Sequence, residues 1–563
     1  MTPLLPRFFP RFFPNYSWLE GLSHTGMRER YLEAFDHIGI DCLNGDKYKT
    51  GKLTPWGDPD PSIFSTESNR EGIQVGTAIA LLVLSESKRS KAELRCRSLE
   101  FRHLWGNAKH AELARNASSE EELQYESLKP PVGLGYPFFP IRTDDRYLTW
   151  PLLPGLFPIS FPGVKTSRDE FLVDIEQDRL KERIAQYFSR DISHAEIARR
   201  WPRMMDQGER YRPEEIRDHL LKRGPTKGRV MRFAYRPFDL RWIYWEPETK
   251  LLDEKRTEYL PHVFEGNFWL AGAQHHRREF DSPTTVQYLG CLHLYERGAN
   301  LFPVYLKGDS ASDNLFSKAR KAMHPNLSEQ SQAYLLTTGA SPEDLFFHCL
   351  ATSFSPAYVD QNSFSLRQDW PRIPLPETKK ALLASARLGQ RIGALLDTEK
   401  PVDGITASKI DPRLRDIGVV SNVGPGGLDP GAGHLDITAG WGHAGKGGVC
   451  MPGAGKHETR AQTDGSLKAA FGDQTLDIYL NDTAYWSNVP KCVWDYHIGG
   501  YQVIKKWLSY REKAILGRGL RVEEAEYVTE MARRIAALIL IQPDLDASYE
   551  AVKADTWPWP QDA

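Results

Sequence analysis

The sequence has few cysteines and no long apolar run, and each shortage excludes a class of protein. Its six cysteines are scattered, with no C-x-x-C pair and no paired histidine spacing. This argues against a disulfide scaffold and against a structural zinc site, and a reducing cytoplasm is the expected location. No apolar stretch approaches the roughly 18 residues that a membrane-spanning helix needs. Prolines interrupt the apolar start of the chain, so a signal peptide is not expected either.

The chain also has almost no net charge. Lysine and arginine number 72 against 74 aspartates and glutamates, which gives a formal net charge of −2. Bulk charge therefore gives no support for nucleic-acid binding, and any such argument must rest on local patches. The length of 563 residues is too great for one hydrophobic core, so two to four domains are expected.

The first 84 residues have the pattern of an α/β domain. Apolar residues at helical spacing predict a helix over 27–38, followed by a short strand at 38–43. Residues 73–84 form a nearly continuous apolar run, which is typical of a strand in a sheet covered on both faces. From 85 to about 130 the pattern is charged and helical.

Proline- and glycine-rich sequence between 130 and 162 marks the first domain boundary. Ser167 and Glu170 then predict a capping box that opens a helix running to Phe188. The remaining pattern predicts short aromatic strands over 229–306, helices at 343–353 and 378–398, a glycine-rich loop at 420–456, and amphipathic helices at 501–515 and 522–541.

Four motifs near the start occur in a fixed order: NYSWL at 15–19, GMRERYL at 26–32, LNGDKYKTGK at 43–52 and GIQVGTAI at 72–79. Together they resemble the late part of the catalytic domain in the single-polypeptide restriction-modification family known as type I SP, whose members are adenine-specific DNA methyltransferases. In that family these segments form the last strands of a Rossmann-like methyltransferase sheet. The resemblance implies an α/β remnant of that sheet in residues 1–125.

Further resemblance to this family lies downstream. The stretch YRPFDLRWIY at 235–244 is similar to the entry of the family's target-recognition region, and two more similar stretches occupy 346–375 and 494–518. The resemblance implies a mixed α+β target-recognition domain at 126–376. A helical and loop-rich specificity subdomain would follow at 377–563.

Two motifs that an N6-adenine methyltransferase needs are missing. One is the acidic and glycine-containing loop that holds S-adenosylmethionine. The other is the Asn-Pro-Pro-Tyr motif that binds and stacks the flipped adenine. The Pro-Pro pair in KPPV at 129–132 has neither the polar residue before it nor the aromatic residue after it. By the family's order both motifs precede Asn15, so the chain is expected to begin inside the catalytic domain. We therefore expect no catalytic residue here and no S-adenosylmethionine bound by this chain alone, although the complete family enzyme uses it.

Other candidate sites are weaker. The stretch GAGKH at 453–457 lacks the first glycine and the Ser/Thr of a phosphate loop. The adjacent His275 and His276 have no third ligand at a sensible spacing, so no metal site is expected.

Local charge restores part of the argument for DNA. Between 199 and 241 there are thirteen lysines and arginines against six acidic residues, interleaved with aromatics. This composition suits phosphate contact and base stacking, whereas the alternative is a solvated helical face that leads into a core strand. The resemblance favours the first interpretation and suggests Arg236, Arg241 and Tyr244 for DNA contact. An arginine in such a strand-rich motif often serves a structural ion pair instead.

The amino-terminal segment suggests further contacts, again through the resemblance. Lys47 and Lys49 are candidates for loop cations beside the target strand, and Asn15, at a strand end, for a residue of the base pocket. The strands near 38–43 and 73–84 are expected to leave edges unpaired and apolar faces uncovered. The expected partners are therefore double-stranded DNA and a polypeptide that supplies the missing methyltransferase half.

Three hypotheses for function remain open at this stage. The first is the DNA-recognition half of an adenine-specific DNA methyltransferase. The second is a DNA-binding specificity subunit without chemistry, which acts in trans. The third is a truncated product without a function of its own, which the proline-interrupted first 14 residues favour.

Overall fold

Two units build the chain, and each contains segments that lie far apart in the sequence. Unit 1 consists of Met1–Leu148, Gln274–Phe280 and Asp360–Pro371, and unit 2 of the remaining chain, Thr149–Ala273, Asp281–Val359 and Arg372–Ala563. The computed structural model describes residues 11–84, 96–118, 124–141, 143–144, 146–225, 228–276, 279–308, 323–445 and 449–560. Within these ranges no helix has the length and apolar character that a membrane span requires. The predicted boundaries near 125 and 376 stay a prediction.

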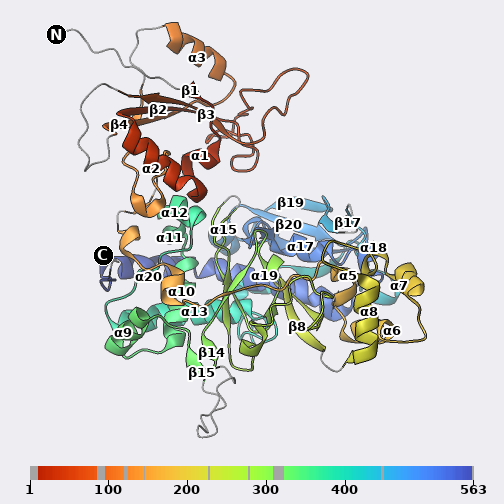
Figure 1. Ribbon diagram of the computed structural model, residues 1–563. Helices are drawn as coiled ribbons and strands as arrows, with labels where there is room; N and C mark the ends of the chain where they lie inside the picture. Colours follow the sequence, from red (N-terminus) through yellow and green to blue (C-terminus); the bar gives the residue numbers. More distant parts are fainter. Residues whose placement is uncertain are drawn as a thin grey trace, which may run out of the picture. The chain divides into compact units, whose positions relative to one another are not determined.

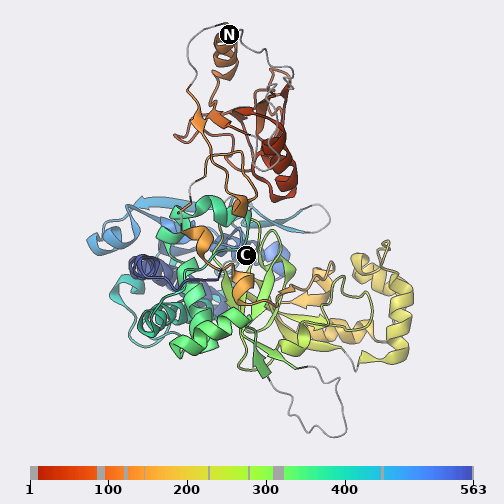
Figure 2. The same cartoon turned by 60° about the vertical axis from the view of Figure 1, so that its left-hand side comes forward.

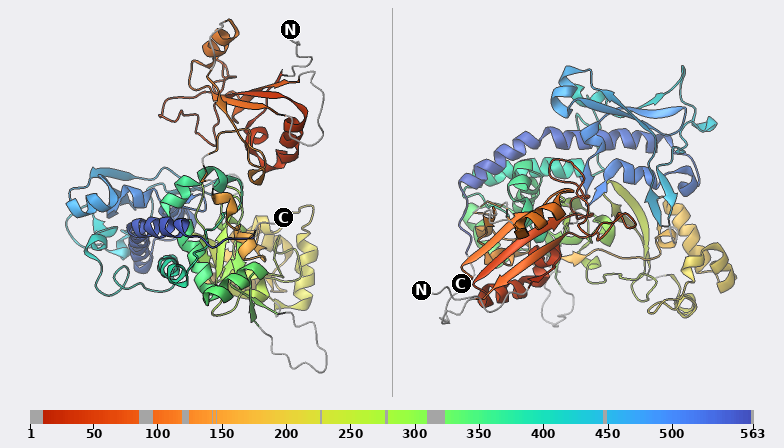
Figure 3. Two further views of the ribbon diagram at one scale, coloured as in Figure 1. Left: turned by 90° about the vertical axis from the view of Figure 1, so that its left-hand side faces the viewer. Right: turned by 90° about the horizontal axis from the view of Figure 1, so that it is seen from above.

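Unit 1 is built on a sheet with the strand order β1-β3-β2-β4-β5 (red to orange in Figure 1). Strands β1 and β2 both run antiparallel to β3, and β2 runs parallel to β4. The strands lie side by side in the right-hand view of Figure 3. The elements of this unit are β1 (Arg11–Phe12), α1 (Tyr16–Glu20), η1 (Leu22–His24), α2 (Thr25–Ala34), β2 (His37–Asn44), β3 (Thr77–Val83), β4 (Ser98–His103), α3 (Lys109–Ser118), β5 (Glu126–Ser127), η2 (Val132–Leu134) and α12 (Ser363–Gln368).

One face of this sheet carries the core of unit 1. Alternate residues of β2 and β3 are buried there, including Ile38, Ile40 and Leu82, and they pack with Trp18 and Leu19 of α1. The opposite face of β3 is only half-buried. The predicted helix and the strand at 38–43 are confirmed, whereas the prediction of a strand covered on both faces is wrong.

The pairing of β3 also differs from the prediction. It was expected to leave edges unpaired, but β1 pairs with one edge and β2 with the other. The two described residues of β1, Arg11 and Phe12, lie in the proline-interrupted start of the chain. A short strand between prolines suffices here, because a residue that follows Pro10 still donates its own N–H.

In its described part, 96–118 and 124–130, the charged stretch from 85 to 130 is not mainly helical. It contains β4, β5 and α3 in its described part, and residues 85–95 lie outside it. In β4 the apolar residues Leu99 and Phe101 alternate with Glu100 and Arg102, which is the pattern of a strand with one polar face. The helical prediction overlooked this short alternation among the charges.

Unit 2 contains several small sheets. Their strand orders are β11-β10-β13-β6, β12-β8-β9-β7, β14-β15, β16-β21-β20-β19, β17-β18 and β22-β23. The strands are β6 (Phe161–Pro162), β7 (Val173–Asp174), β8 (Arg229–Arg236), β9 (Asp239–Trp245), β10 (Trp269–Gly272), β11 (Thr284–Val286), β12 (Leu289–Gly290), β13 (Asn300–Pro303), β14 (Tyr305–Lys307), β15 (Met323–Pro325), β16 (Val419–Asn422), β17 (Gly442–Ala444), β18 (Cys450–Pro452), β19 (His457–Ala461), β20 (Gln474–Tyr479), β21 (Ala484–Pro490), β22 (His497–Ile498) and β23 (Tyr501–Gln502).

Helices pack around these sheets, and α6 to α8 gather in one yellow group in Figure 2. The α-helices are α4 (Leu153–Leu156), α5 (Asp169–Leu172), α6 (Gln177–Tyr187), α7 (His194–Arg200), α8 (Pro213–Arg223), α9 (Glu329–Thr338), α10 (Pro342–Ser353), α13 (Lys379–Leu396), α14 (Pro412–Arg415), α15 (Gly465–Phe471), α16 (Lys491–Trp494), α17 (Val503–Ser509), α18 (Lys513–Leu516), α19 (Val522–Leu540) and α20 (Gln542–Ala554). Short 3-10 turns are η4 (Pro202–Met204), η6 (Leu260–His262), η7 (Leu292–Leu294) and η8 (Pro430–Ala432), while η3 (Tyr147–Thr149) and α11 (Pro356–Gln361) lie at unit boundaries.

The predicted capping box at Ser167 is wrong. Ser167 has a positive φ of 56°, and its hydroxyl donates to Asp253 instead of capping a helix. The expected single helix is two helices, α5 and α6, separated by β7. The pairing of Val173 and Asp174 with β9 outweighs the local helical pattern at this point.

The carboxy-terminal part is helical, as predicted, but it also contains a sheet. Helices α13 and α19 confirm the predictions at 378–398 and 522–541, and Arg534 of α19 donates to carbonyl oxygens at the end of α13. The predicted loop at 420–456 contains the short strands β17 and β18. The fold as a whole is a mixed α/β arrangement of small sheets with a helical carboxy-terminal part.

Candidate nucleic-acid interface

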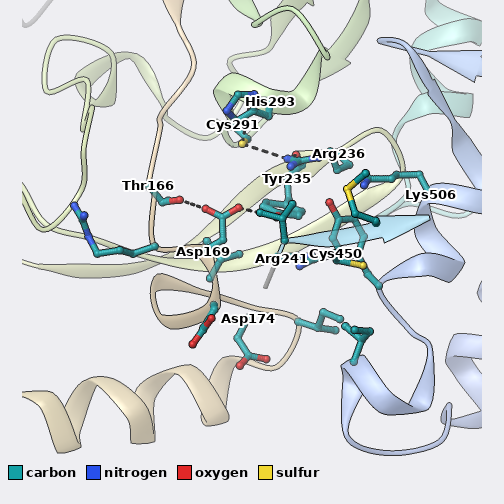
Figure 4. A pocket seen from close by; sticks show the side chains of 18 of the residues that line it. Thr166, Asp169, Asp174, Tyr235, Arg236, Arg241, Cys291, His293, Cys450 and Lys506 are labelled. Carbon is teal, nitrogen blue, oxygen red and sulfur yellow. Dashed lines mark hydrogen bonds between the residues drawn. The ribbon is translucent and has the colours of Figure 1, made fainter. Parts of the chain in front are cut away.

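A cleft of about 1040 Å³ opens in unit 2, between segments from across its sequence. Its walls come from residues near 165–183, from β8 and β9, from the turn after β12, from β18, and from β23 to α18. Figure 4 shows 18 of the lining side chains, ten of them labelled, which project from these different elements toward one space. The cleft is therefore a product of the tertiary structure and not of one motif.

Positive charge dominates the lining. Nine lysine and arginine side chains face four carboxylates. Some of these cations have carboxylate partners: Arg183 Nη1 lies 2.8 Å from Asp174 Oδ2, and Lys165 Nζ lies 2.8 Å from Asp253 Oδ2. The lining nevertheless keeps a surplus of cations, which suits an anionic ligand.

The hairpin of β8 and β9 places two arginines at the centre of the cleft. Arg236 pairs with Asp239 across a two-residue turn of Pro237 and Phe238, in which Phe238 has a φ of 57°. The hydroxyl of Tyr527 donates to the carbonyl oxygen of Phe238 at 2.7 Å and fixes this turn. The turn thus directs Arg236 and Arg241 into the same wall.

Three cations and three tyrosines alternate around this wall, and we call the group the cation–tyrosine ring. Its members are Tyr235, Arg241, Tyr510, Lys506, Tyr501 and Arg236, in that order around the ring. Each cation lies over two tyrosine rings, which are attracted to positive charge through their π faces.

The contacts around the ring are of similar length. The Arg241 guanidinium carbon lies 4.0 Å from the ring centroid of Tyr235 and 4.3 Å from that of Tyr510. Lys506 Nζ lies 4.6 Å from the centroid of Tyr510 and 5.6 Å from that of Tyr501. The Arg236 guanidinium carbon closes the ring, 4.1 Å from Tyr235 and 5.6 Å from Tyr501.

Arg241 is held by a buried carboxylate. Its Nε and Nη2 donate to Asp239 Oδ2 at 3.0 and 2.7 Å, and Arg511 Nη2 donates to Asp239 Oδ1 at 2.8 Å. Although burial alone raises the pKa of the Asp239 carboxyl, the two guanidinium groups hold it below its usual range. Arg241 is thus fixed in position by charge pairing.

Arg236 is bound less completely. Its Nη1 donates to the carbonyl oxygen of Tyr235 at 2.6 Å and lies 3.5 Å from Cys291 Sγ. Its Nε is buried and has no hydrogen-bond partner within the described part of the chain. Of the two predicted arginines, Arg241 is paired with a carboxylate, whereas Arg236 has none at ion-pair distance in the described part of the chain.

Three titratable groups of the cleft are shifted toward their uncharged forms. Burial raises the pKa of the Cys291 thiol, and burial together with the charge of Arg236 lowers the pKa of His293. Burial also raises the pKa of Tyr501 to about 12. At neutral pH these groups therefore add no charge to the lining.

The structure brings together Arg236 and Arg241 but not Tyr244. Tyr244 is 3% exposed, and its ring packs against Phe188 and close to the backbone of Gly228. It does not line the cleft. The prediction of DNA contact by Tyr244 finds no support in this arrangement, because the core of β9 covers the side chain.

The remaining predicted residues lie in unit 1. Lys47 Nζ lies 3.0 Å from Glu71 Oε2, and Lys49 pairs with Glu20. Burial and the charge of Arg367 lower the pKa of Lys49 to about 8. Asn15 is the N-cap of α1 and accepts a hydrogen bond from Trp18 N. All three side chains have structural contacts, and their roles toward DNA stay predictions.

The basic stretch at 199–241 is less basic in the structure than in the sequence. Arg199 and Arg200 pair with Glu196, and Arg223 pairs with Glu246 and Glu248. These carboxylates lie outside the counted stretch, so counting along the chain overstated the local surplus of charge.

Sequence reasoning missed part of the cleft. Tyr501, Lys505, Lys506 and Tyr510 line it beside the two arginines. All four lie within the family-like stretch at 494–518, so a signal was present. The sequence did not show that this stretch packs beside β8 and β9 in the folded chain.

In the described ranges, no group of three or more His, Cys, Asp or Glu side chains is placed to hold a metal ion. His275 Nδ1 is 3.0 Å from the carbonyl oxygen of Gln368. That the chain has no metal site stays a prediction.

Comparison with known proteins gives one family match and several structural matches. Residues 155–535 match the model of the Type ISP C-terminal specificity domain. No curated protein matches the chain.

Three solved structures are similar in fold. A nuclease-deletion mutant of the Type ISP restriction-modification enzyme LlaGI, in complex with a DNA substrate mimic, has a TM-score of 0.56 and 15% identity over 96% of this chain and 46% of its own. The DrdV–DNA complex has a TM-score of 0.58 and 16% identity over 96% of this chain and 50% of its own. The ATP-dependent Type ISP enzyme LlaBIII bound to DNA has a TM-score of 0.56 and 16% identity over 97% of this chain and 33% of its own.

These identities establish a likeness of fold, and the chain spans half or less of the length of the three proteins. The family match adds to this likeness because the matched residues include β8, β9 and all six residues of the cation–tyrosine ring. Since the matched region, 155–535, makes up most of the sequence, the chain belongs to the family of Type ISP C-terminal specificity domains.

Proposed function

We propose that this chain is a DNA-recognition region of a restriction-modification enzyme and that it contacts duplex DNA at the cleft of unit 2. The observation that carries the proposal is the surplus of cations there, nine lysines and arginines against four carboxylates. DNA presents a dense row of negative phosphates, and contacts to them supply most of the sequence-independent affinity.

Two further observations support this proposal. The similar proteins LlaGI, DrdV and LlaBIII were all solved with DNA or a DNA mimic. In addition, strand β18 forms part of the cleft wall, and Met451 on it is 47% exposed. A two-stranded ribbon such as β17–β18 is narrow enough for the major groove, where base edges are read.

The experiment is a titration of labelled duplex DNA at several salt concentrations, followed by fluorescence anisotropy. Log K should fall linearly with log salt, with a slope of roughly 0.9 per phosphate contacted. A double variant, Lys505→Gln with Lys506→Gln, should reduce the slope. The matched control removes two exposed cations on α13, Lys380→Gln with Arg387→Gln. If both double variants bind like the unchanged chain at every salt concentration, the cleft is not the DNA surface.

We also propose that unit 1 is the last part of a Rossmann-like methyltransferase sheet, of the adenine-specific type that the motifs at 15–79 suggest. The supporting observation is its topology. Strands β1 and β2 are both antiparallel to β3 and hence parallel to one another, and helices α1 and α2 connect them. A strand–helix–strand connection of this kind is the repeating unit of doubly wound α/β sheets.

The residues of unit 1 do not fit S-adenosylmethionine. A cofactor in such a sheet lies at the carboxyl ends of the parallel strands, which are marked here by Asn44 and Asp46. The Asn44 amide donates to the carbonyl oxygens of Cys42 and Leu104, and the Asp46 carboxylate accepts from the backbone of Tyr48, Lys49 and Gly76. These groups are used internally, so we derive no step through the cofactor.

Calorimetric titration with S-adenosylmethionine tests this second proposal. No heat of binding is expected from the chain alone, whereas micromolar affinity, about −8 kcal/mol, would contradict the proposal. Adding a polypeptide with the cofactor loop and the Asn-Pro-Pro-Tyr motif should restore methylation. DNA binding without any restored methylation would instead indicate a specificity subunit that acts in trans. A chain that fails to bind DNA under all conditions would indicate a truncated product.

A further inference from the structure

We propose that the cation–tyrosine ring is an anion site for one phosphate group of a nucleic-acid backbone, contacted by Arg236 and Lys506, with Arg241 as a positioning residue. This inference rests on the proposed function, because it names the group of the DNA that the cleft binds. It also assigns different roles to the two arginines that the sequence had grouped together.

The charge of Arg241 is already balanced by a buried carboxylate. The buried Asp239 accepts from its Nε and Nη2, and the rings of Tyr235 and Tyr510 lie about 4 Å from its guanidinium carbon. Because Arg511 binds the other oxygen of Asp239, the carboxylate itself is fixed from two sides. Arg241 therefore orients the two tyrosines rather than contacting DNA.

Arg236 and Lys506 are in the opposite situation. Within the described ranges neither side chain has a carboxylate at ion-pair distance, and both are half-buried at the cleft wall. Arg236 also keeps a buried Nε without a partner. A cation that is partly removed from water without an anion is costly, so a bound anion would stabilise this arrangement.

Tyr501 joins these two cations. Its ring lies 5.6 Å from the Arg236 guanidinium carbon and 5.6 Å from Lys506 Nζ. The two positive groups thus lie at the same distance from the centre of one ring, although one comes from β8 and the other from α17. A single anion placed between them would be bound by a planar guanidinium fork and an ammonium group, which suits phosphate oxygens.

The tyrosines are not available to stack bases. Each of the three rings already lies beneath two cations of the group. Their role is to hold three like charges together through cation–π attraction. We therefore expect the site to bind a phosphate group of the backbone and not to stack a base.

A second carboxylate, that of Asp169, lies beside the ring and also lines the cleft. The Asp169 carboxylate accepts from the Tyr235 hydroxyl at 2.7 Å and from the Thr166 hydroxyl, as Figure 4 shows. Each of its oxygens thereby accepts one hydrogen bond from a neutral hydroxyl, and it forms no ion pair with the cations of the ring in the described part of the chain. The ring keeps its positive charge toward the cleft.

The test compares variants in the full chain by the salt dependence of duplex binding. The double variant Arg236→Gln with Lys506→Gln removes both cations of the site and should reduce the slope of log K against log salt by about 0.9, equivalent to a roughly 3.5-fold smaller change between 50 and 200 mM salt. Each single variant should reduce the slope by part of that amount. Arg387→Gln and Lys380→Gln are the matched controls and should leave the slope unchanged. An unchanged slope in Arg236→Gln would overturn the inference.

A double variant serves as the background that tests the positioning role of Arg241. If Arg241 acts through the ring, then Arg241→Gln weakens DNA binding in the unchanged chain but not when Arg236→Gln and Lys506→Gln are combined. A purely structural residue would lower the melting temperature and weaken binding equally in both backgrounds. Equal weakening in both backgrounds, or a separate loss of slope by Arg241→Gln, would contradict the assigned role.

A second probe, inorganic phosphate, separates this inference from the proposed function. At matched ionic strength, phosphate should raise the melting temperature relative to chloride in the unchanged chain and in Arg387→Gln, but less in Arg236→Gln. If the chain does not bind duplex DNA but shows this protection, the proposed function fails and the anion site stands. If DNA binds but Arg236→Gln changes neither the slope nor the phosphate protection, the anion site fails and the proposed function stands.

Discussion

Arg241 and Asp239 lie two residues apart on β9 and form a buried ion pair, with 2.7 Å between Nη2 and Oδ2. Asp239 is 1% exposed, and Arg511, from the turn after α17, reaches its second oxygen at 2.8 Å. The carboxylate thus joins the strand-rich part of unit 2 to its carboxy-terminal helices. Several consequences of such buried contacts are measurable.

Asp239→Asn should destabilise unit 2 strongly. The change leaves two guanidinium groups in the interior without a negative partner, and removal of one member of a buried ion pair typically costs about 3 to 5 kcal/mol. The measurement is a urea unfolding curve. Asp411→Asn is the control, because its pair with Arg413 is partly exposed and should contribute less than about 1 kcal/mol. A loss below 1 kcal/mol in Asp239→Asn would show that the pair is not essential to the core.

The stability of unit 2 should fall between neutral and acidic pH because of His348. This histidine is fully buried, its Nδ1 is 2.8 Å from Ser385 Oγ and its Nε2 is 2.7 Å from the carbonyl oxygen of Pro374. Burial lowers its pKa to about 4, below the ordinary value of 6.5. The unfolded chain therefore takes up the proton first, so the contribution is complete above about pH 6.5 and is lost as the pH falls toward 4.

The size of this effect is roughly 3 kcal/mol, at about 1.4 kcal/mol for each unit of pKa difference. Urea unfolding at pH 7.5, 6.0 and 5.0 measures it. His348→Gln should make the curve flatter across this interval, while His324→Gln, at an exposed position, should not. Parallel pH curves for the unchanged chain and His348→Gln would exclude His348 as the source.

Gly389→Ala should destabilise the packing of α13 on α10. A Cβ at this position would lie 1.8 Å from the carbonyl oxygen of Phe347, which is backbone and unable to move aside alone. Helix propensity favours alanine by up to about 1 kcal/mol, but forced overpacking typically costs about 1 to 3 kcal/mol, so we expect a net loss. Gly465→Ala on α15, where nothing lies within 4 Å, is the control. The measurement is the melting temperature of each variant. A Gly389→Ala variant as stable as the control would argue against the close contact between Gly389 and the backbone of Phe347.

The amides of β3 should be protected from hydrogen exchange in the isolated chain. Both of its edges are paired, by β1 and by β2, and one of its faces lies in the core of unit 1. Exchange in the exposed strand β19 serves as the internal comparison, because all of its residues are exposed. Exchange in β3 as fast as in β19 would show that this sheet opens without a partner polypeptide.

The sequence by itself determined the elements whose pattern is long and regular. Helix α19 and helix α13 have apolar residues at helical spacing over eighteen or more positions, and both were predicted within a few residues. The strand at 38–43 and the family-like motifs at 235–244 and 494–518 could also be identified from the sequence alone. Local spacing carries this information, because a helix or strand face repeats with a fixed period.

Short elements escaped the same reasoning. Strand β7 has two residues, and its pairing with β9 divides the helix that the local pattern predicted after Ser167. Strand β4 was hidden among charged residues that occupy its solvent-facing side. A period cannot be recognised in so few residues, so contacts made elsewhere decide the conformation.

The tertiary structure alone decided which residues form the candidate site. Nothing in the local sequence of Arg236 and Arg241 indicates that Tyr501, Lys506 and Tyr510 return to them from more than 250 residues away, or that Asp239 and Arg511 fix only one of the two. The same holds for Tyr244, whose place in the core follows from the packing of β9. The spacing of residues along the chain indicates which face of a single helix or strand is apolar. Burial and charge pairing depend instead on which faces contact one another, and those contacts form only when the whole unit packs.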